Sequence, residues 1–211
     1  MIYDYIIQNY DNGEPIFLSE LPGNSKDYLR QEMKQLCDSG KLERLYNGVY
    51  YLSYLPILGT KGKMSIDRYI EKKYLNAGGY MTGLWLANKY GFTTQNPSCY
   101  EVCSNGATTK QRKQIIDGNT IIVYKPVTDI TEKNKSVLQF LDLMSVIDKY
   151  SEIKGTELVT KLKKYVESVK VDFSVVKELL SFYPDKVYRN IYEGGLMGEL
   201  VSACNSIKNS N

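Results

Sequence analysis

The dipeptide Asn47-Gly48 restricts the fold of this chain more than any other feature of the sequence. Two runs rich in β-forming residues flank it, Lys41–Tyr46 and Val49–Leu52. Asparagine and glycine tolerate positive φ, which a type I′ turn requires at both of its central positions. The sequence therefore predicts a tight two-stranded hairpin with Asn47-Gly48 at its tip.

The residues before this hairpin show helical patterns separated by turn signals. In order, we expect a helix over Met1–Tyr10, a short extended piece, a brief helix from Ser19 that Pro22-Gly23 ends, and a long helix that Asn24 or Ser25 caps and that runs to Ser39. Helices followed by a hairpin are the order of a winged helix, which places its third helix in the major groove of DNA. We therefore predict an N-terminal winged helix-turn-helix domain over residues 1–56.

The long helix has one apolar and one polar face. Apolar residues recur at helical spacing on the first face: Leu29, Met33, Leu36 and Cys37. The opposite face and its flank carry polar or basic side chains, namely Ser25, Lys26, Tyr28, Arg30, Gln31, Lys34 and Gln35. Glutamine can bridge N6 and N7 of adenine, arginine can bridge O6 and N7 of guanine, and hydroxyls can donate to phosphates. This composition predicts a DNA-reading helix.

Residues 62–211 are predicted to form a larger mixed α+β domain, after a connector that contains two glycines. Ser65 and Thr82 are expected to cap its first two helices. A strand over Tyr100–Cys103 and a hairpin around Asp117-Gly118-Asn119 are expected next. Beyond Lys133 the apolar residues recur at helical spacing, so the fold class is α+β with a helical C-terminal part.

Charge is distributed unevenly along the chain. Residues 1–55 hold five cations and eight anions, a net charge of −3, whereas residues 56–211 hold 22 cations and 16 anions, a net charge of +6. The basic residues of the second part form four clusters: Lys61/Lys63, Lys72/Lys73, Lys110/Arg112/Lys113 and Lys161/Lys163/Lys164. A polyanion that touches both parts fits this pattern, and a lysine-rich solvated surface fits it equally well.

The last two basic clusters can each be interpreted in structural terms as well as in terms of binding a polyanion. Lys110/Arg112/Lys113 lies between two predicted strands, where a loop can reach phosphates or a sheet edge can be protected by lysines. Lys161/Lys163/Lys164 is better interpreted as a solvated helix face, because Glu157 and Glu167 stand four residues from Lys161 and Lys163.

Several protein classes are excluded by what the sequence lacks. Histidine is absent, which excludes serine–histidine and cysteine–histidine nucleophile pairs and histidine-bearing zinc sites. The four cysteines form no CxxC pair, so we expect reduced thiols. The N-terminus has no signal-peptide pattern, and the run Val49–Leu58 is far shorter than the roughly 20 apolar residues of a spanning helix. We expect a cytoplasmic protein with no membrane partner.

No known catalytic motif is present. The sequence lacks a GxxxxGKS loop, a GxGxxG loop after a strand, and the Asp-x-Asp pair of a nucleotidyltransferase. The nearest approach to a magnesium nuclease is Asp67 or Asp117 with Glu101, but no lysine stands two residues after Glu101. We therefore expect no catalytic residue, no cofactor and no metal, with a residual nuclease as a minor alternative.

Five segments, in chain order, form a more specific pattern: Lys41–Tyr51, Gly79–Leu84, Gly91–Pro97, Ser104-Asn105 and Val137–Asp142. In these segments the sequence resembles the AbiEi-type antitoxins of bacterial abortive-infection (type IV) toxin–antitoxin systems. The first resembles their "gKLeRlgrGvYy" wing and the last their "LQ-LLD" helix start. This series is far more specific than any single motif.

The resemblance implies a winged helix that binds repeats in double-stranded operator DNA and represses its own operon. It also implies an α+β domain that counters a nucleotidyltransferase-like toxin encoded beside it, without a stable complex. The sequence departs from the family at Asn47, where the family pattern has a basic residue, and in its acidic N-terminal module. Both departures shift the expected phosphate contact toward the C-terminal domain.

Our principal hypothesis is a non-enzymatic, DNA-binding autorepressor that acts as an antitoxin in phage defence. The polar residues of the long helix would enter or flank the major groove. The hairpin residues Arg44, Tyr46 and Asn47 would hold the DNA backbone. Further cations would add sequence-independent affinity: Lys61, Lys63, Lys110, Arg112 and Lys113. The alternative is an interaction module whose winged helix binds a partner protein, such as the toxin.

Overall fold

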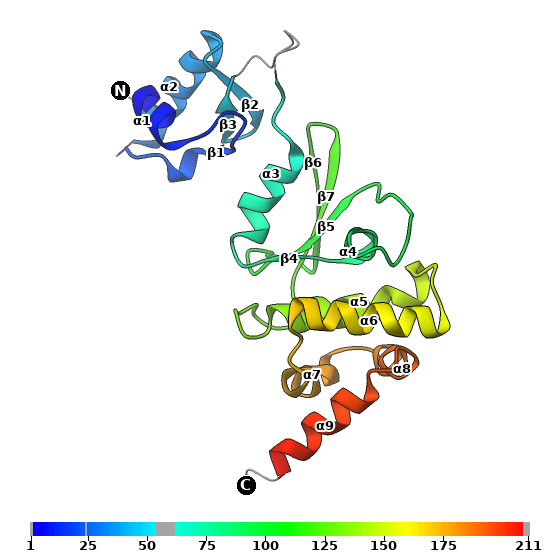
Figure 1. The fold of residues 1–211 in the computed structure, drawn as a ribbon. Helices are drawn as coiled ribbons and strands as arrows, with labels where there is room; N and C mark the ends of the chain where they lie inside the picture. The colour runs from blue at the N-terminus through cyan, green and yellow to red at the C-terminus, as the bar shows by residue number, and fades with distance from the viewer. Residues whose placement is uncertain (1, 24, 54–61, 209–211) are drawn as a thin grey trace. The chain divides into compact units, whose positions relative to one another are not determined.

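The structure is a computed structural model that describes residues 2–23, 25–53 and 62–208 (Figure 1). It confirms the predicted α+β class, with a three-stranded antiparallel sheet and a four-stranded mixed sheet. Its contacts divide the chain into two compact units. Unit 1 comprises Met1–Lys73 with Ile115–Asn119, and unit 2 comprises Tyr74–Gln114 with Thr120–Asn211. Each unit is described separately.

Unit 1 contains the predicted winged helix. Its elements are α1 (Ile2–Asn9), β1 (Ile16–Phe17), α2 (Lys26–Asp38), β2 (Leu42–Tyr46) and β3 (Val49–Leu52). The sheet order is β1-β3-β2. The helix expected from Ser19 is only a single 3-10 turn over Leu18–Glu20, and Leu21 returns to extended backbone before Pro22.

The apolar face of α2 closes the core of this unit. Leu29 and Met33 are 3% and 0% exposed, packed in one cluster with Ile6 of α1 and Leu42 of β2. Burial of each such side chain stabilises the fold by about 1.5–3 kcal/mol. Ser25 caps the helix as predicted, its Oγ accepting from the Tyr28 N–H at 3.4 Å. The buried face therefore fixes which side chains of α2 point outward.

The hairpin forms where the sequence predicts it, with a different turn. Gly48 has φ of +74°, whereas Asn47 is not among the described residues with positive φ. The ladder also shifts register between Arg44 and Tyr46. One left-handed glycine beside a bulge is the pattern of a type I turn followed by a bulge, so the expected type I′ turn is wrong. The predicted strands and their tip are confirmed.

Within unit 1, the half-buried Lys72 joins the next helix to the winged helix through hydrogen bonds and ion pairs. Helix α3 (Ile66–Ile70) continues as a π-helical turn over Glu71–Leu75. The Lys72 Nζ donates at 2.8 Å to Glu14 Oε1 and at 2.8 Å to the Pro15 carbonyl, and lies 3.6 Å from Glu20 Oε2. It also stands 4.6 Å from the centroid of the Tyr10 ring.

Two further contacts join the same segments. The Arg68 guanidinium donates to the Asn12 carbonyl at 3.0 Å, and the rings of Phe17 and Tyr69 lie 6.0 Å apart. The structure therefore groups residues up to Lys73 with the winged helix, whereas the sequence indicated a boundary between residues 56 and 62. The amino-acid composition identifies the connector. The boundary of the unit, however, is determined by contacts between residues more than 50 positions apart in the sequence.

Unit 2 is built on the sheet order β4-β5-β7-β6. Its strands are β4 (Tyr80–Met81), β5 (Tyr100–Cys103), β6 (Gln111–Ile116) and β7 (Asn119–Tyr124). Strand β5 runs antiparallel to β4 and parallel to β7. The loop between β6 and β7, which the contacts assign to unit 1, consists of Asp117 and Gly118, with φ of +46° and +76°. Positive φ at both positions is the type I′ pattern that the sequence had suggested for Asn47-Gly48.

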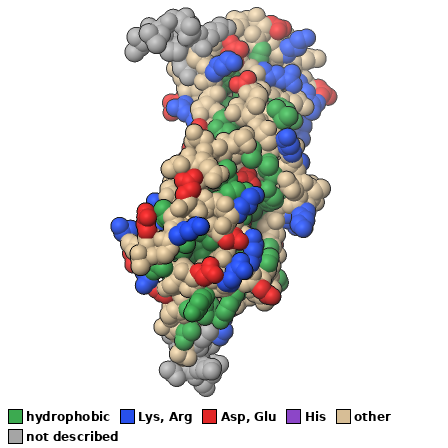
Figure 2. All heavy atoms as spheres, turned by 90° about the vertical axis from the view of Figure 1, so that its right-hand side faces the viewer, with side chains coloured by type: hydrophobic (Ala, Val, Ile, Leu, Met, Phe, Trp, Pro, Cys, Tyr) green, Lys and Arg blue, Asp and Glu red, His purple; other side chains and the backbone are tan. Residues whose placement is uncertain are grey.

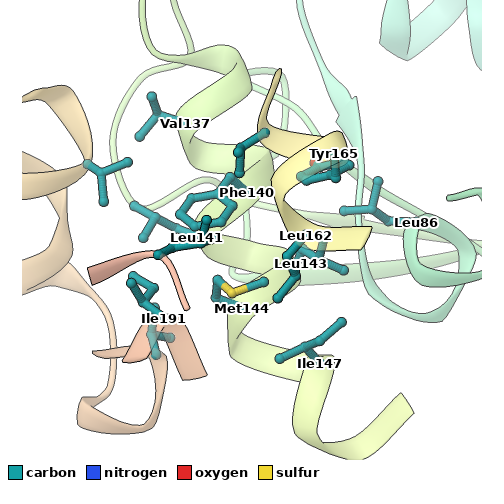
Figure 3. Packing of buried hydrophobic residues seen from close by; sticks show 14 of the residues in the cluster. Leu86, Val137, Phe140, Leu141, Leu143, Met144, Ile147, Leu162, Tyr165 and Ile191 are labelled. Carbon is teal, nitrogen blue, oxygen red and sulfur yellow. The ribbon is translucent and has the colours of Figure 1, made fainter. Parts of the chain in front are cut away.

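Helices enclose the second core. They are α4 (Gly83–Lys89), α5 (Lys135–Tyr150), α6 (Gly155–Val169), α7 (Phe173–Leu179), α8 (Asp185–Glu193) and α9 (Met197–Lys208). Helix α5 packs against α4, α7 and α8, and α9 packs against α7. Figure 3 shows Phe140, Leu143 and Met144 of α5 facing Leu86 of α4 and Leu162 of α6. Helix α5 is therefore the central element of unit 2.

The Lys72 contacts generate a stability prediction. Lys72→Met retains the apolar stem but removes the ammonium, so the free energy of unfolding should fall by about 1.5–3 kcal/mol at neutral pH. Burial opposes ionisation of Glu14, but the Lys72 hydrogen bond and the Asp11 amide bring the pKa of its carboxyl below the ordinary value. This stability is present above the unfolded pKa and is lost as the pH falls through the folded pKa.

Urea unfolding of the whole chain at neutral and at acidic pH measures this effect. The difference between the wild type and Lys72→Met should shrink on acidification. Lys26→Met is the control, because Lys26 is exposed on α2 and its replacement should change stability by under about 0.5 kcal/mol. Equal effects of the two substitutions would contradict the anchoring role of Lys72.

Candidate nucleic-acid interface

The polar face of α2 points to solvent as the sequence predicted. All seven proposed side chains of this segment are exposed: Ser25, Lys26, Tyr28, Arg30, Gln31, Lys34 and Gln35. Tyr28 is 61% exposed, which is unusual for a large aromatic side chain in a packed unit. The two glutamines stand four residues apart, one turn of the same face. This face can present amide and guanidinium donors to base edges.

A hollow separates α2 from the hairpin, and we call it the α2–hairpin hollow. Its volume is about 430 Å³. It is lined by Leu18, Arg30, Lys34, Cys37, Asp38, Arg44, Asn47, Gly48 and Tyr50. Two cations of α2 thus share one concave surface with a cation and an amide of the hairpin. The tertiary structure brings together residues that the sequence had assigned to the same role from two separate elements.

The hairpin tip is organised by Arg44. Its guanidinium donates to Asn47 Oδ1 at 2.9 Å and, through Nε, to the Tyr46 carbonyl at 3.4 Å. Tyr46 is 43% exposed beside it. The side chain of Asn47 therefore orients the arginine that stands next to it. A guanidinium held in this way is preorganised for bidentate contact with a phosphate.

Carboxylates limit the attraction for DNA. Asp27 pairs with Arg30 at 2.6 Å, and Asp38 lines the α2–hairpin hollow. Both members of the Arg30 pair are exposed, and an exposed pair is worth only about 0–1 kcal/mol, so a guanine or a phosphate can displace Asp27 at small cost. Figure 2 shows basic and acidic side chains interspersed over the face that it presents. Because Asp27 and Asp38 stand beside these cations, affinity at this site must come from local geometry more than from a broad positive field.

The remaining candidate cations are placed elsewhere. Lys63 is exposed shortly before α3, and Lys61 lies outside the described residues. Lys110, Arg112 and Lys113 are exposed in unit 2. Arg112 and Lys113 belong to β6, the edge strand of the sheet, which agrees with the sheet-edge alternative and not with the loop alternative. Strand β6 begins at Gln111, before the Asp117-Gly118-Asn119 turn around which the sequence predicted the hairpin.

Five lining residues of the hollow were not among the predicted contacts: Leu18, Cys37, Asp38, Gly48 and Tyr50. Tyr50 is the register partner of Arg44 because the ladder shifts register between Arg44 and Tyr46; the predicted two-residue turn would have paired Arg44 with Tyr51. Leu18 and Asp38 come from a 3-10 turn and from the last turn of α2. No local pattern predicts that these two residues meet the hairpin.

Unit 2 holds a second candidate cavity, of about 270 Å³, which contains the nuclease candidate Glu101. The Glu101 carboxylate accepts from the Leu84 N–H at 2.9 Å and from the Tyr124 hydroxyl at 3.1 Å. It lies against Gly83, whose φ is +63° and where a Cβ would collide with it. Glu101 thus caps α4, and the cap predicted for the Thr82 side chain is wrong.

The Thr82 hydroxyl instead donates a hydrogen bond to Asp142 of α5, which lines the same cavity. Asp142 Oδ2 accepts from Thr82 and from Tyr80, each at 3.1 Å, and from the Cys103 thiol at 3.4 Å. Its Oδ1 accepts from Tyr183 at 2.9 Å. Burial raises the pKa of the Asp142 carboxyl, more than these four hydrogen bonds lower it. The same burial raises the pKa of the Cys103 thiol and keeps it protonated.

These hydrogen bonds give the carboxylates of Glu101 and Asp142 a structural role. Glu101 fastens α4 to β5, and Asp142 joins four uncharged donors to α5. Within the described ranges, no three His, Cys, Asp or Glu side chains gather closely enough to hold a metal ion. Asp67 belongs to unit 1, where it takes part in the Ser65 cap of α3.

Comparison with known proteins leaves the family open. No family model and no curated protein matches the chain. The chain is similar in structure to the RV2827C protein from Mycobacterium tuberculosis, with a TM-score of 0.49 and 13% identity over 96% of this chain and 78% of that one. This similarity is too low to carry an argument about function. In the described parts of the chain, no helix has the length and apolar composition needed to cross a bilayer.

The Asp142 network generates a prediction about pH. A carboxyl with a raised folded pKa holds its proton longer in the folded than in the unfolded state, so its contribution to stability falls as the pH rises above about 4. Asp142→Asn removes this titration. The stability of the wild type relative to Asp142→Asn should therefore be highest near pH 4 and should decline toward neutral pH.

Denaturant unfolding between pH 4 and 8 tests this, with Asp148→Asn as the control on the exposed side of α5. Asp142→Ala should cost about 3 kcal/mol at all these pH values, because it leaves buried donors unpaired. A flat difference between the wild type and Asp142→Asn would contradict the raised pKa.

Proposed function

We propose that this chain is a non-enzymatic, sequence-specific DNA-binding protein that represses its own operon. The observation that carries the proposal is the α2–hairpin hollow. There Arg30 and Lys34 of α2 stand with Arg44 and Asn47 of the hairpin beside an exposed, glutamine-bearing helix face. A winged helix reads DNA with these two elements.

In this proposal α2 lies in the major groove. Gln31 and Gln35 bridge adenines, and Arg30 leaves Asp27 to bridge a guanine. Ser25, Lys26 and Tyr28 contact phosphates from the start of the helix, where exposed N–H groups also favour anions. Arg44, oriented by Asn47, holds a phosphate from the hairpin, and Tyr46 packs against the sugar backbone.

The acidic composition of the N-terminal region requires a second source of affinity. Lys110, Arg112 and Lys113 of unit 2 supply it without reading sequence, because lysine and arginine contacts to phosphates release counterions from any duplex. In this proposal, elements of unit 1 recognise the base sequence, and cations of unit 2 supply affinity that does not depend on sequence.

The antitoxin role rests on the resemblance of the sequence to AbiEi-type antitoxins. In that role the chain counters a nucleotidyltransferase-like toxin encoded beside it, without a stable complex. The neighbouring gene tests this part of the proposal: it should encode a Gly-Ser turn followed by an Asp-x-Asp pair. Co-expression should then relieve the growth arrest that the toxin causes.

The division of work generates the main functional prediction. Gln31→Ala should weaken binding to the upstream region of the gene by about 1–3 kcal/mol and should relax the preference at one base position. Lys113→Ala should weaken all sequences alike and reduce the slope of log affinity against log salt by about one. Fluorescence anisotropy with operator and scrambled duplexes at several salt concentrations measures both.

Two exposed residues outside the proposed contacts serve as controls, Gln8→Ala on α1 and Lys133→Ala before α5. Neither should change affinity by more than twofold. If Gln31→Ala and Lys113→Ala gave the same sequence profile, the division between reading and attraction would be wrong.

The rival function is an interaction module whose winged helix binds a protein. Asp27 and Asp38 on α2 are the observations that favour it, because they oppose phosphates. Under this rival, no salt-dependent shift of the upstream DNA would occur, and the neighbouring gene product would co-purify with the chain. A gel-shift experiment with the upstream DNA at several salt concentrations, together with the co-purification, therefore separates the two functions.

A further inference from the structure

A third hollow, of about 610 Å³, lies wholly within unit 2, and we call it the α6 hollow. One wall is Tyr90, at the C-terminal end of α4, and the other is a stripe of α6. The lining residues on α6 are Thr156, Glu157, Thr160, Lys161, Lys164, Tyr165 and Ser168. Small-molecule sites usually measure about 300–1,000 Å³, so its size suits a low-molecular-weight ligand.

The helical period explains why these residues face one hollow. Thr156, Thr160, Lys164 and Ser168 follow one another at intervals of four residues, and Glu157, Lys161 and Tyr165 form the adjacent row. Lys163 falls outside both rows and is exposed to solvent. The structure therefore separates three lysines that the sequence indicated as one solvated cluster.

The hollow carries an excess of positive charge. Within residues 2–23, 25–53 and 62–208, no carboxylate lies within ion-pairing distance of Lys161 or Lys164, although Glu157 lines the same surface. Lys163 and Lys164 are exposed, as expected of the predicted solvated face, whereas Lys161 is only half-exposed. Two cations and one anion leave a net positive surface that attracts an anionic group.

Lys161 is held in position by its surroundings. Its Nζ stands 5.9 Å from the centroid of the Phe92 ring. It also lies so close to Gly91 that a Cβ at that position would be 2.8 Å away. Gly91 has φ of +68° directly after α4, so the ammonium rests against backbone that only glycine leaves open. A positioned ammonium loses less entropy on binding than a free one.

Two hydroxyls of the hollow already donate within α6, whereas the Tyr165 hydroxyl is buried and has no hydrogen-bond partner among the described residues. The Thr160 hydroxyl donates to the Thr156 carbonyl, and the Ser168 hydroxyl donates to the Tyr165 carbonyl, both at 2.8 Å. The Thr160 and Ser168 hydroxyls offer acceptor oxygens to a ligand, and the ammonium groups of Lys161 and Lys164 are its charged donors. Such a site recognises an anion by charge.

The aromatic wall adds a second requirement. The ring of Tyr90 meets the ring of Tyr165 edge to face, with centroids 4.6 Å apart and planes at 84°. Burial raises the pKa of the Tyr90 phenol, which stays neutral and does not repel an anion. A fixed, half-buried aromatic ring beside two ammonium groups suits a ligand that joins a planar ring to a phosphate.

We propose that the α6 hollow is a binding site for a mononucleotide, with its phosphates between Lys161 and Lys164 and its base against Tyr90. The site is separate from the residues assigned to operator DNA and does not depend on that assignment. The phosphates of a nucleic-acid strand share the same chemistry, so the test must distinguish a free nucleotide from a strand.

Isothermal titration of the full chain with ATP, pyrophosphate and a ten-residue oligo(dT) is the test. ATP should bind, and Lys161→Gln/Lys164→Gln should weaken it at least tenfold. Lys163→Gln is the matched control: it removes the same charge from the same helix and should change the affinity less than twofold. Tyr90→Leu should weaken ATP binding severalfold and leave pyrophosphate binding unchanged, because only the base contacts the ring.

Several outcomes would overturn the proposal. They are the absence of ATP binding at millimolar concentration, an equal loss in Lys163→Gln, or an unchanged ATP affinity in Tyr90→Leu. Oligo(dT) that binds at this site more tightly than ATP and displaces it would assign the site to a strand. If the double substitution lowers the melting temperature, the single variant Lys164→Gln replaces it, because Lys164 is exposed.

Discussion

The burial of one face of α2 is the constraint on which the candidate interface depends. Leu29 and Met33 close the core of unit 1, and a helix turns by about 100° per residue, so the positions of these two side chains fix the direction of all the others. Gln31 and Gln35 then face solvent, and Arg30 and Lys34 face the hairpin. A different rotation of the helix would bury amide and charged groups without partners, at a cost of several kcal/mol. Core packing and surface chemistry are therefore two consequences of one helical pattern.

Unit 2 depends in a similar way on a single polar group. Asp142 projects from the central helix α5 and receives hydrogen bonds from Tyr80, Thr82, Cys103 and Tyr183. Apolar contacts around α5 supply most of the stability but little direction, whereas a hydrogen-bonded network has only one satisfied arrangement. Two of the segments that carry the family resemblance, Gly79–Leu84 and Val137–Asp142, meet at this network. That meeting gives a structural reason for their residue types without assigning the chain to a family.

The two proposals place different chemistry in different units. The α2–hairpin hollow combines cations, an amide and a neighbouring face of glutamines, which suits a duplex that offers both phosphates and base edges. The α6 hollow combines two ammonium groups, which form no ion pair within the described residues, with one aromatic wall, and this suits a small anion with a ring. The carboxylates also differ: Asp38 in the first hollow and Asp27 beside Arg30 oppose DNA, whereas Glu101 and Asp142 accept hydrogen bonds that hold unit 2 together.

Short-range patterns in the sequence determined the α+β class, the helices, the two hairpins and the outward face of α2, because helical period, turn residues and caps act within a few residues. They also identified Arg44 and Asn47 as hairpin-tip residues. The tertiary structure decided what depends on distant partners. Glu101 displaces Thr82 as the cap of α4, Lys72 joins α3 to the winged helix, and Asp38 and Leu18 complete the α2–hairpin hollow. It also decided which lysines of α6 share a hollow with Tyr90. These contacts join residues remote along the chain, and their energies depend on packing that no local pattern encodes.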